Sequence, residues 1–432
     1  MDHVYIENLP SHVGAKVTLK GWVANKSSKG KLHFIQLRDG TGFVQCVVFK
    51  ADVTEEVFDL CGHLSQESAI IVNGEVRSDP RAPSGVEIGV ISVAQYSGSV
   101  DFPISPKEHG TAFLMENRHL WLRSRKQQAI MRVRAEVWRA MCEYLDGEGF
   151  IRCDSPILTP AACEGTTTLF ELDYFDIGKA YLTQSGQLYN EANAMALGKV
   201  YCFGPVFRAE RSKTRKHLNE FWMLEPEFAW AELEDVIALA EGTIMHTIST
   251  VLRTRKTELA ALERDTAKLE VIKAPFPRVT HREAVEIVRS KGLEMGDKED
   301  FGAPQEEALG SHFDGQPVVV THWPAEIKAF YMKRDPNDPS LVLGCDIIAP
   351  EGFGEIVGGS QREDDYDLIL NRIREHKLPE EVFQWYLDLR KYGSVPHGGF
   401  GLGLERMVSW MCGSEHVRQC IPYPRTLYRI FP

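Results

Sequence analysis

The segment FRAERSKTRKHLNEFWMLEPE, residues 207–227, is the most informative stretch of the sequence for the fold. It joins two β-rich stretches, 200–208 and 221–230, through a polar and basic loop, which predicts an antiparallel strand pair. Broad antiparallel strands mixed with helices favour an α+β fold over a doubly wound parallel sheet. Side chains alternate along a strand, so one face of the second strand carries Phe221, Met223, Glu225 and Glu227. Two carboxylates beside an aromatic ring are unusual in a core and indicate a binding site.

The side chains of this segment suit a nucleotide. Arg208 offers a planar fork of donors that fits a carboxylate and a phosphate. Glu210 can accept from an exocyclic amine such as adenine N6, and Phe221 offers a ring face for stacking. His217 and the basic loop can reach phosphates or an RNA end. The sequence contains no Walker A pattern, which excludes a P-loop as the nucleotide-binding device.

Two glycine-rich segments further along the chain extend this site. GFGLGLER, 399–406, predicts a strand that a ligand can approach closely, with Arg406 in the first turn of a following helix and near an outer phosphate. GEIVGGSQR, 354–362, places Glu355 before two glycines. A carboxylate there suits Mg²⁺, which prefers oxygen ligands.

The rest of the chain predicts two domains. Residues 1–98 contain short strands at 17–23, 31–39, 43–49 and 69–76, separated by turn residues, which favour a small OB-type barrel. A proline-containing hinge at 99–112 leads to a larger domain, 113–432. In it, apolar periodicity predicts helices at 124–146 and 232–260, and the weakly patterned residues from about 262 to 320 suggest an insertion.

Composition narrows the class of protein. The 432 residues are 43% hydrophobic and 25% charged, as in a water-soluble globular protein. We see no secretory signal and no apolar run long enough to cross a bilayer, and we expect a cytoplasmic protein. The nine cysteines show no C-x-x-C spacing, so buried thiols are more plausible than a zinc site.

The net charge of −12, taken alone, argues against a nucleic-acid partner, but the positive charges are clustered along the chain. Residues 16–38 hold five Lys, one Arg and no acid, and a second basic cluster comprises Arg211, Lys213, Arg215 and Lys216. Two basic patches on an acidic chain fit a protein that holds RNA at two places, although solvated loops explain them equally well.

Three elements together resemble the class II aminoacyl-tRNA synthetases. The helix at 124–146 followed by GFIRCDSP, 149–156, resembles motif 1; 207–227 resembles motif 2; 399–406 resembles motif 3. The likeness covers nearly the whole chain. It implies an α+β protein with an N-terminal OB-fold β-barrel that binds the tRNA anticodon, and a catalytic domain built on a mainly antiparallel sheet flanked by helices. It also implies a homodimer, ATP as substrate, Mg²⁺ at Glu355, and catalytic roles for Arg208 and Arg406.

The OB domain and the motifs resemble the subclass that charges aspartate, asparagine and lysine. TQSGQLYNE, 183–191, resembles asparaginyl members: Gly186 and Asn190 stand where aspartyl members have Pro and a Lys that neutralises the substrate carboxylate. The resemblance implies that Glu225 accepts from the substrate amide and that Arg362 donates to its carbonyl oxygen. An aspartate would place its carboxylate against Glu225, so that one of the two would have to take up a proton. The implied amino-acid site comprises Glu164, Ser185, Gln187, Glu225 and Arg362. The implied ATP site comprises Arg208, Glu210, His217, Phe221, Glu355 and Arg406.

Some positions depart from the pattern or leave alternatives open. Gly358 stands where aspartyl members have a Ser that binds the metal, and Asp346 is a candidate to replace that ligand. The segment PHGG, 396–399, is closer to archaeal-type aspartyl members. The resemblance assigns Phe34, Gln45 and Arg38 to the anticodon interface, with Phe34 and Gln45 on the central base U35; a core role explains Phe34 equally well. Besides tRNA(Asn) charging, the alternatives are an aspartyl enzyme of relaxed tRNA specificity, an asparagine synthetase on the same catalytic domain, and a non-catalytic RNA-binding paralogue.

Overall fold

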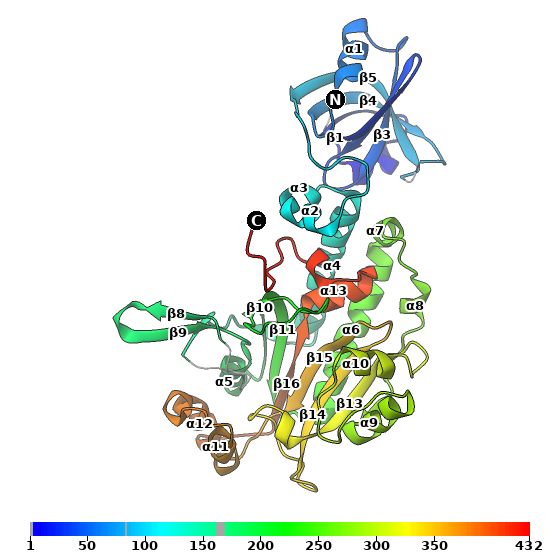
Figure 1. The fold of residues 1–432 in the computed structure, drawn as a ribbon. Helices are drawn as coiled ribbons and strands as arrows, with labels where there is room; N and C mark the ends of the chain where they lie inside the picture. The colour runs from blue at the N-terminus through cyan, green and yellow to red at the C-terminus, as the bar shows by residue number, and fades with distance from the viewer. Residues whose placement is uncertain (1–2, 83, 161–168) are drawn as a thin grey trace. The chain divides into compact units, whose positions relative to one another are not determined.

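The chain forms two compact units, Met1–Leu114 and Met115–Pro432 (Figure 1). The computed structural model describes residues 3–82, 84–160 and 169–432. Across these described ranges, no helix is both long enough and apolar enough to cross a membrane.

The N-terminal unit is a closed five-stranded barrel. Its strands, in barrel order, are β1 (Lys16–Lys29), β2 (Leu32–Arg38), β3 (Phe43–Phe49), β5 (Val86–Ser97) and β4 (Ala69–Ser78). All pairs are antiparallel except β3 with β5. A short 3-10 helix, η1 (Ile6–His12), precedes β1, and helix α1 (Glu55–His63), capped by the Thr54 side chain, links β3 to β4. Alternate strand residues fill one apolar core, and the predicted OB-fold barrel is confirmed.

Two details of this unit differ from the sequence prediction. The strand at β5, which closes the barrel, is absent from the four predicted strands. The segment expected as a hinge at 99–112 is bonded to the barrel: Ser65 donates to the Ser99 carbonyl at 2.5 Å, and Gln66 donates to the Ile104 carbonyl at 3.1 Å. The prolines of residues 99–112 indicate an extended segment, but they do not show that side chains of the barrel hydrogen-bond to it.

The C-terminal unit is built on an eight-stranded sheet. In sheet order its strands are β12 (Arg278–Thr280), β13 (Val318–Pro324), β14 (Leu341–Ala349), β15 (Gly354–Gln361), β16 (His397–Gly403), β11 (Glu220–Ala229), β10 (Lys199–Phe207) and β6 (Ile151–Arg152). Only the two outermost pairs, β12 with β13 and β6 with β10, are parallel. The predicted, mainly antiparallel sheet of an α+β domain is therefore confirmed.

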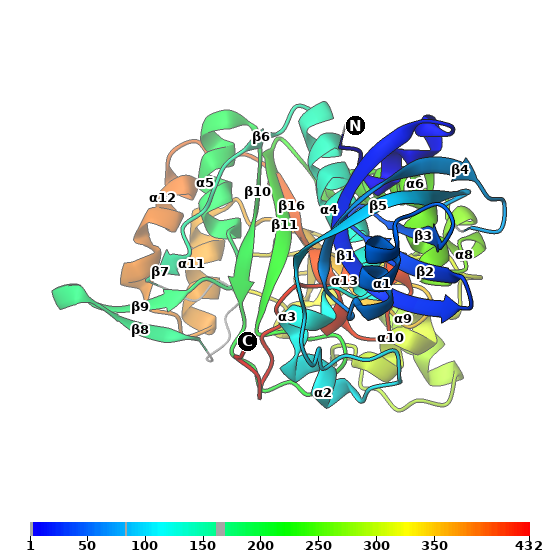
Figure 2. The same ribbon diagram turned by 90° about the horizontal axis from the view of Figure 1, so that it is seen from above.

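Helices supply two apolar cores beside this sheet. The longest, α4, begins after Ser124, whose hydroxyl accepts from the Gln127 N–H, and its buried stripe includes Ile130, Val133 and Val137. The helices of this unit are α2 (Thr111–Glu116, which begins in the N-terminal unit), α3 (Arg118–Trp121), α4 (Arg125–Gly147), α5 (Gln187–Leu197), α6 (Leu233–Thr254), α7 (Lys256–Ala261), α8 (Ala267–Glu270), α9 (His281–Ser290), α10 (Ala303–Gly310), α11 (Tyr366–Glu375), α12 (Gln384–Lys391) and α13 (Leu404–Cys412). Figure 2 shows α5, α11 and α12 grouped on one side of the sheet.

Two sequence predictions need correction here. The helix expected over 232–260 is two helices, because Arg255 leaves the helical conformation between α6 and α7 and its guanidinium bonds Glu136 on α4 at 2.6 and 2.9 Å. The insertion expected at 262–320 instead supplies part of the central sheet, namely β12 and the beginning of β13. A three-residue edge strand is too short to show periodicity.

A separate three-stranded sheet projects from this unit (Figures 1 and 2). It consists of β7 (Leu158–Thr159), β8 (Glu171–Tyr174) and β9 (Gly178–Leu182), with the turn η2 (Phe175–Ile177) at its tip. Phe175 and Ile177 in this turn are more than four-fifths exposed. The hairpin therefore presents apolar side chains to its surroundings.

Candidate active site

The hairpin of β10 and β11 forms the floor of the site. Cys202 lies opposite Glu225 and Gly204 opposite Met223, in continuous antiparallel register. Asn219 closes the loop, since its side-chain amide donates to the carbonyls of Arg208 at 2.7 Å and Glu210 at 3.2 Å. The loop that carries the basic cluster is therefore tied to the strand end that carries Arg208.

The neighbouring strand β16 approaches this hairpin closely. A Cβ on Gly399 would lie 2.2 Å from the Pro226 carbonyl oxygen and 2.4 Å from the Glu227 carboxylate. Only glycine fits that position, so the glycine run serves strand packing as well as ligand approach.

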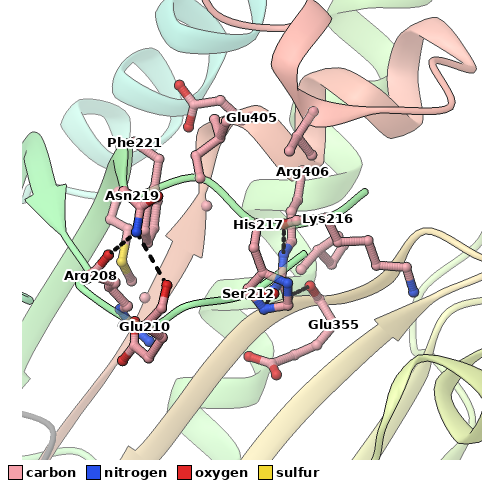
Figure 3. Close-up of a pocket in the computed structure, with 16 residues that line it drawn as sticks. Arg208, Glu210, Ser212, Lys216, His217, Asn219, Phe221, Glu355, Glu405 and Arg406 are labelled. Atoms are coloured by element: carbon pink, nitrogen blue, oxygen red, sulfur yellow. Dashed lines mark hydrogen bonds between the residues drawn. The ribbon is translucent and has the colours of Figure 1, made fainter. Parts of the chain in front are cut away.

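A cavity of about 130 Å³ lies between the hairpin and the start of α13 (Figure 3). Figure 3 shows Arg208, Glu210 and Phe221 on one side and His217, Glu355 and Arg406 on the other. The structure thus brings together all six residues predicted for ATP. Other side chains line the cavity that the sequence did not single out for it: Ser212, Lys216, Leu218, Asn219, Met223, Ile356, Glu405 and Val417.

Positive charge converges on this cavity. The Arg208 guanidinium lies 5.7 Å from the Phe221 ring centre, and Arg406 donates to the Glu355 carbonyl at 2.5 Å. His217 lies 3.5 Å from Arg406. Burial, and then the charges of Arg406, Arg208 and Lys216, lower the pKa of His217 to about 4. His217 is therefore neutral at pH 7 and acts as a hydrogen-bonding group.

Helix α13 is fixed from the side of α4. Glu405, buried beside Arg406, pairs with Arg134 at 2.7 Å and accepts from the Trp222 backbone at 3.0 Å. Motifs 1, 2 and 3 thus meet at one carboxylate, and the sequence alone gave no sign of this contact.

Two carboxylates face each other across Gly358. A Cβ on Gly358 would lie 3.0 Å from a Glu355 carboxylate oxygen and 3.6 Å from an Asp346 carboxylate oxygen. Lys328, which the sequence analysis missed, donates to Asp346 at 2.7 Å and lies over the Trp323 ring at 3.6 Å. Burial, followed by the charge of Asp346, raises the pKa of Glu355 to about 7. Such a pair calls for a cation and supplies the oxygen donors that Mg²⁺ prefers.

Glu355 and Asp346 are the candidate ligands for a metal ion. Among the described residues, no group of three or more His, Cys, Asp and Glu side chains is arranged to hold a metal ion. Glu355 and Asp346 fit a magnesium ion that takes its remaining ligands from phosphates and water.

A second cavity of about 270 Å³ adjoins the first. The two share the lining residues Arg208, Met223, Glu355 and Gly401. The second also contains Ser185, Gln187, Glu225 and Arg362, four of the five residues predicted for the amino acid. The fifth, Glu164, lies outside the described residues. Arg208 therefore stands at the junction of the two cavities.

The contacts of Glu225 and Arg362 are more specific than the sequence indicates. The Ser185 hydroxyl and the Gly186 backbone N–H (3.0 Å) both donate to Glu225. Arg362 is almost fully buried and donates two hydrogen bonds to the Glu227 carboxylate. It also donates to the Ser360 hydroxyl at 2.7 Å. Strand alternation placed Glu227 at the site, but its pairing with Arg362 was not predicted, because a contact across 135 residues leaves no mark in local spacing.

Asn190 and Glu191 sit behind this cavity, fully buried on α5. The Asn190 amide donates to the Glu225 carbonyl at 3.1 Å and brings no charge to the cavity. Glu191 accepts from Gln187 (3.0 Å), Tyr386 (2.8 Å) and Arg390 (2.6 Å), and lies 3.0 Å from His397. Burial alone would raise the pKa of Glu191, but Arg390 and His397 outweigh burial and hold it well below its ordinary value.

The residues predicted for the anticodon lie on the barrel of the N-terminal unit. Phe34 and Gln45 are on adjacent strands, β2 and β3; Gln45 is exposed and Phe34 is half-buried. Arg38 differs from the prediction: it is 5% exposed, forms an ion pair with Glu67, and lies 4.8 Å from the Trp22 ring centre. Its charge is held inside the unit, so Arg38 supports the barrel surface and does not offer a free cation.

The fold and the three-motif site are those of a class II tRNA synthetase. The family described as tRNA synthetases class II (D, K and N) matches residues 111–427, and the OB-fold nucleic acid binding domain matches residues 17–93. An asparagine–tRNA ligase of Pelotomaculum thermopropionicum is 52% identical over the full length of both chains. One of Chloroflexus aurantiacus is 54% identical, with 99% of this chain and 98% of that protein covered.

The solved structures agree. The crystal structure of asparaginyl-tRNA synthetase from Pyrococcus horikoshii complexed with asparaginyl-adenylate superposes with a TM-score of 0.94, at 45% identity and 99% coverage of both chains. The chain belongs to the asparagine–tRNA ligase family.

Proposed function

We propose that this protein activates L-asparagine with ATP to asparaginyl-adenylate and transfers the asparaginyl group to the 3′ end of tRNA(Asn). The observation that carries the proposal is the pair of adjoining cavities that share Arg208, one lined with nucleotide-binding groups and the other with Glu225 and Arg362. The similarity to a synthetase solved with asparaginyl-adenylate supports the same activity.

In the first cavity the proposed roles follow from chemistry. Phe221 stacks on adenine and Glu210 accepts from its N6 amine, while Arg406 meets the outer phosphate. Neutral His217 hydrogen-bonds to the phosphates and adds no charge. Arg208, at the junction, contacts both the α-phosphate and the asparagine carboxylate.

In the second cavity we propose that Glu225 accepts from the side-chain amide of asparagine and that Arg362 donates to its carbonyl oxygen. Ser185 and Gly186 hold the Glu225 carboxylate in place, and Gln187 lines the same space. Since Glu227 already neutralises Arg362, the site offers a donor without net positive charge. An aspartate would place its carboxylate against Glu225, and Arg362 is already paired with Glu227, which disfavours aspartate binding.

The reaction requires no nucleophilic side chain. The asparagine carboxylate attacks the α-phosphorus of ATP and pyrophosphate leaves; a ribose hydroxyl at the tRNA 3′ end then attacks the adenylate carbonyl and AMP leaves. Arg208 and Arg406 bind, orient and neutralise the phosphates, so catalysis comes from positioning and charge. Glu355 and Asp346 would hold Mg²⁺, which supplies further neutralisation of phosphate charge.

The proposal extends to assembly and location. Exposed apolar side chains on and near the motif 1 strand, including Ile151, Ile157 and Leu158, suit a dimer interface between two copies of the chain. On the barrel we propose that Phe34 stacks on the central anticodon base U35 and Gln45 reads its edge. ATP and tRNA are cytoplasmic substrates, and we propose a cytoplasmic location.

ATP–pyrophosphate exchange without tRNA, run in parallel with L-asparagine and L-aspartate, tests the activity. We expect exchange with asparagine alone. Exchange driven by aspartate would favour the aspartyl alternative, and absence of exchange with either amino acid would favour a non-catalytic paralogue.

A further inference from the structure

A lysine lies against the two carboxylates that the proposed function assigns to Mg²⁺. Lys328 Nζ donates to Asp346 Oδ2 at 2.7 Å, and the side chains of Lys328 and Asp346 are only 12% and 6% exposed. Both residues line the second cavity together with Glu355. The proposed function gives Asp346 and Glu355 a role but leaves this buried cation without one.

The two oxygens of Asp346 face different partners. Asp346 on β14 lies opposite Gly358 on β15, and a Cβ on Gly358 would lie 3.6 Å from Asp346 Oδ1 and 3.0 Å from Glu355 Oε1. Oδ1 and the Glu355 carboxylate therefore face the same space beside Gly358, whereas Oδ2 is bonded to Lys328. While that bond holds, Asp346 presents one oxygen to the space and cannot bind a metal through both.

The ammonium of Lys328 is fixed from behind. Nζ lies 3.6 Å from the ring centre of Trp323, a distance at which the ring face attracts a cation. Trp323 is fully buried, and its indole N–H donates to the Val320 carbonyl at 3.2 Å. The cation therefore has a defined place in the protein without any ligand.

The backbone that carries Lys328 is fixed as well. Lys328 directly follows the 3-10 helix η3 (Ala325–Ile327). Arg372 on α11, itself buried, donates to the Ala325 carbonyl at 3.0 Å and to the Lys328 carbonyl at 3.3 Å. Because both the backbone and the ammonium are held, Lys328 has little freedom to swing away from Asp346.

The charge of Lys328 has two opposite consequences for this site. Two carboxylates that face one buried space repel each other, and one ammonium in contact with them offsets that repulsion. The same ammonium leaves the group with one negative charge instead of two, which weakens its attraction for a divalent cation. Mg²⁺ is usually held by one or two carboxylates together with waters and substrate phosphates.

We propose that Lys328 is a positioning residue that keeps Asp346 and Glu355 from holding a divalent cation until ATP supplies phosphate oxygens. The metal would then enter the site with the nucleotide and not before it. This inference rests on the proposed function, which places ATP in the first cavity, and adds an order of binding to it.

The test measures Mn²⁺ binding to the full-length protein without nucleotide, asparagine or tRNA. The protein is titrated with MnCl2, and free Mn²⁺ is followed by electron paramagnetic resonance. Lys328→Met removes the charge but keeps a long, unbranched side chain against Trp323. Lys328→Arg keeps the charge. Lys333→Met is the matched control, because Lys333 pairs with Asp364 and Glu363 and is not among the described residues that line either cavity.

We expect Lys328→Met to bind about one Mn²⁺ per chain about tenfold more tightly than wild type, because one unit of opposing charge is lost. Lys328→Arg and Lys333→Met should both stay within about twofold of wild type. The gained site should disappear in Lys328→Met/Glu355→Gln, which separates it from Mn²⁺ held elsewhere on an acidic chain.

A second measurement tests the order of binding. The affinity for AMPCPP, the α,β-methylene analogue of ATP, is measured by calorimetry with and without Mn²⁺. Coupling between two ligands is reciprocal, so the gain in AMPCPP affinity on adding Mn²⁺ should be smaller in Lys328→Met than in wild type. An equal gain in the two proteins would overturn the proposal.

Unchanged or weaker Mn²⁺ binding by Lys328→Met, in a variant that unfolds at the wild-type temperature, would also overturn it. So would a gain in Lys328→Arg as large as that in Lys328→Met, since arginine keeps the charge. Lys328→Gln carries the same comparison where Lys328→Met does not fold. Mn²⁺ binding requires neither asparagine nor tRNA, so a wild-type protein without exchange would contradict the proposed function while the metal-binding result still stood.

Discussion

At the scale of single residues, the proposed function assigns the choice of amino acid to Glu225. Glu225→Gln removes the carboxylate that we assign to the substrate amide while keeping the side-chain size. We expect kcat/KM for asparagine in exchange to fall about a hundredfold, equivalent to about 2.7 kcal/mol of transition-state binding. Aspartate should lose less, because a glutamine amide can donate to its carboxylate.

The exposed Glu286→Gln on α9 is the matched control and should leave exchange unchanged. An equal fall for both amino acids in Glu225→Gln would mean that Glu225 supports the strand and does not select the substrate.

The residues of the site were predictable to the extent that each carries recognisable local chemistry. Arg208, Glu355 and Arg406 stand in short motifs, and the structure gathers them around one cavity. Lys328 could not be predicted, and neither could the pairing of Glu227 with Arg362, because these contacts join residues 18 and 135 positions apart in the sequence. Arg38 has the residue type of an RNA contact, but Glu67 holds it inside the barrel unit.

At the scale of elements, Glu191 joins α5, α12 and β16 through one buried carboxylate. Arg390 and Tyr386 come from α12 and His397 from β16, and Glu191 also holds Gln187 on its own helix. Removing the charge would leave the buried guanidinium of Arg390 without its acidic partner. The network therefore supports both the packing of these elements and the orientation of Gln187 in the amino-acid cavity.

We expect Glu191→Gln to lower the free energy of unfolding by about 3 kcal/mol in urea titrations at pH 7, and to raise the KM for asparagine. The folded pKa of Glu191 is depressed, so its contribution is complete above the unfolded pKa of about 4.3 and is lost as the pH falls below that value. The difference from wild type should persist from pH 8 to about 5 and shrink only in more acidic solution. A stability equal to that of the exposed control Glu294→Gln would contradict this assignment.

The longest helix and the central hairpin were predicted well, whereas the 12-residue strand β5 was not among the strands named from the sequence. The α4 stripe and the β10–β11 hairpin follow the expected helix and strand patterns. The errors fall on β12, which is only three residues long, and on the break at Arg255, where a distant glutamate attracts the side chain. Tertiary contacts determine both the pairing of β12 and the helix break at Arg255, and a short stretch of sequence does not show such contacts.

At the scale of the whole molecule, the proposed function assigns separate roles to the two compact units. Among the residues that the structure describes, those that line the two cavities all belong to Met115–Pro432, whereas Phe34 and Gln45 belong to Met1–Leu114. Chemistry that needs only ATP and asparagine should therefore be indifferent to the barrel surface, while charging of tRNA should depend on it.

Phe34→Ala tests this division. Stacking of one base on an aromatic side chain contributes about 1–3 kcal/mol, so we expect the KM for tRNA(Asn) in aminoacylation to rise at least about fivefold. Exchange without tRNA should be unchanged. Phe49→Ala is the matched control, since Phe49 is a 38% exposed ring on β3 of the same barrel. Equal losses in the two variants would assign Phe34 to barrel stability. A fall in exchange would show that the barrel surface influences the catalytic unit. A rise in KM confined to Phe34→Ala would place the anticodon contact on the β2–β3 face.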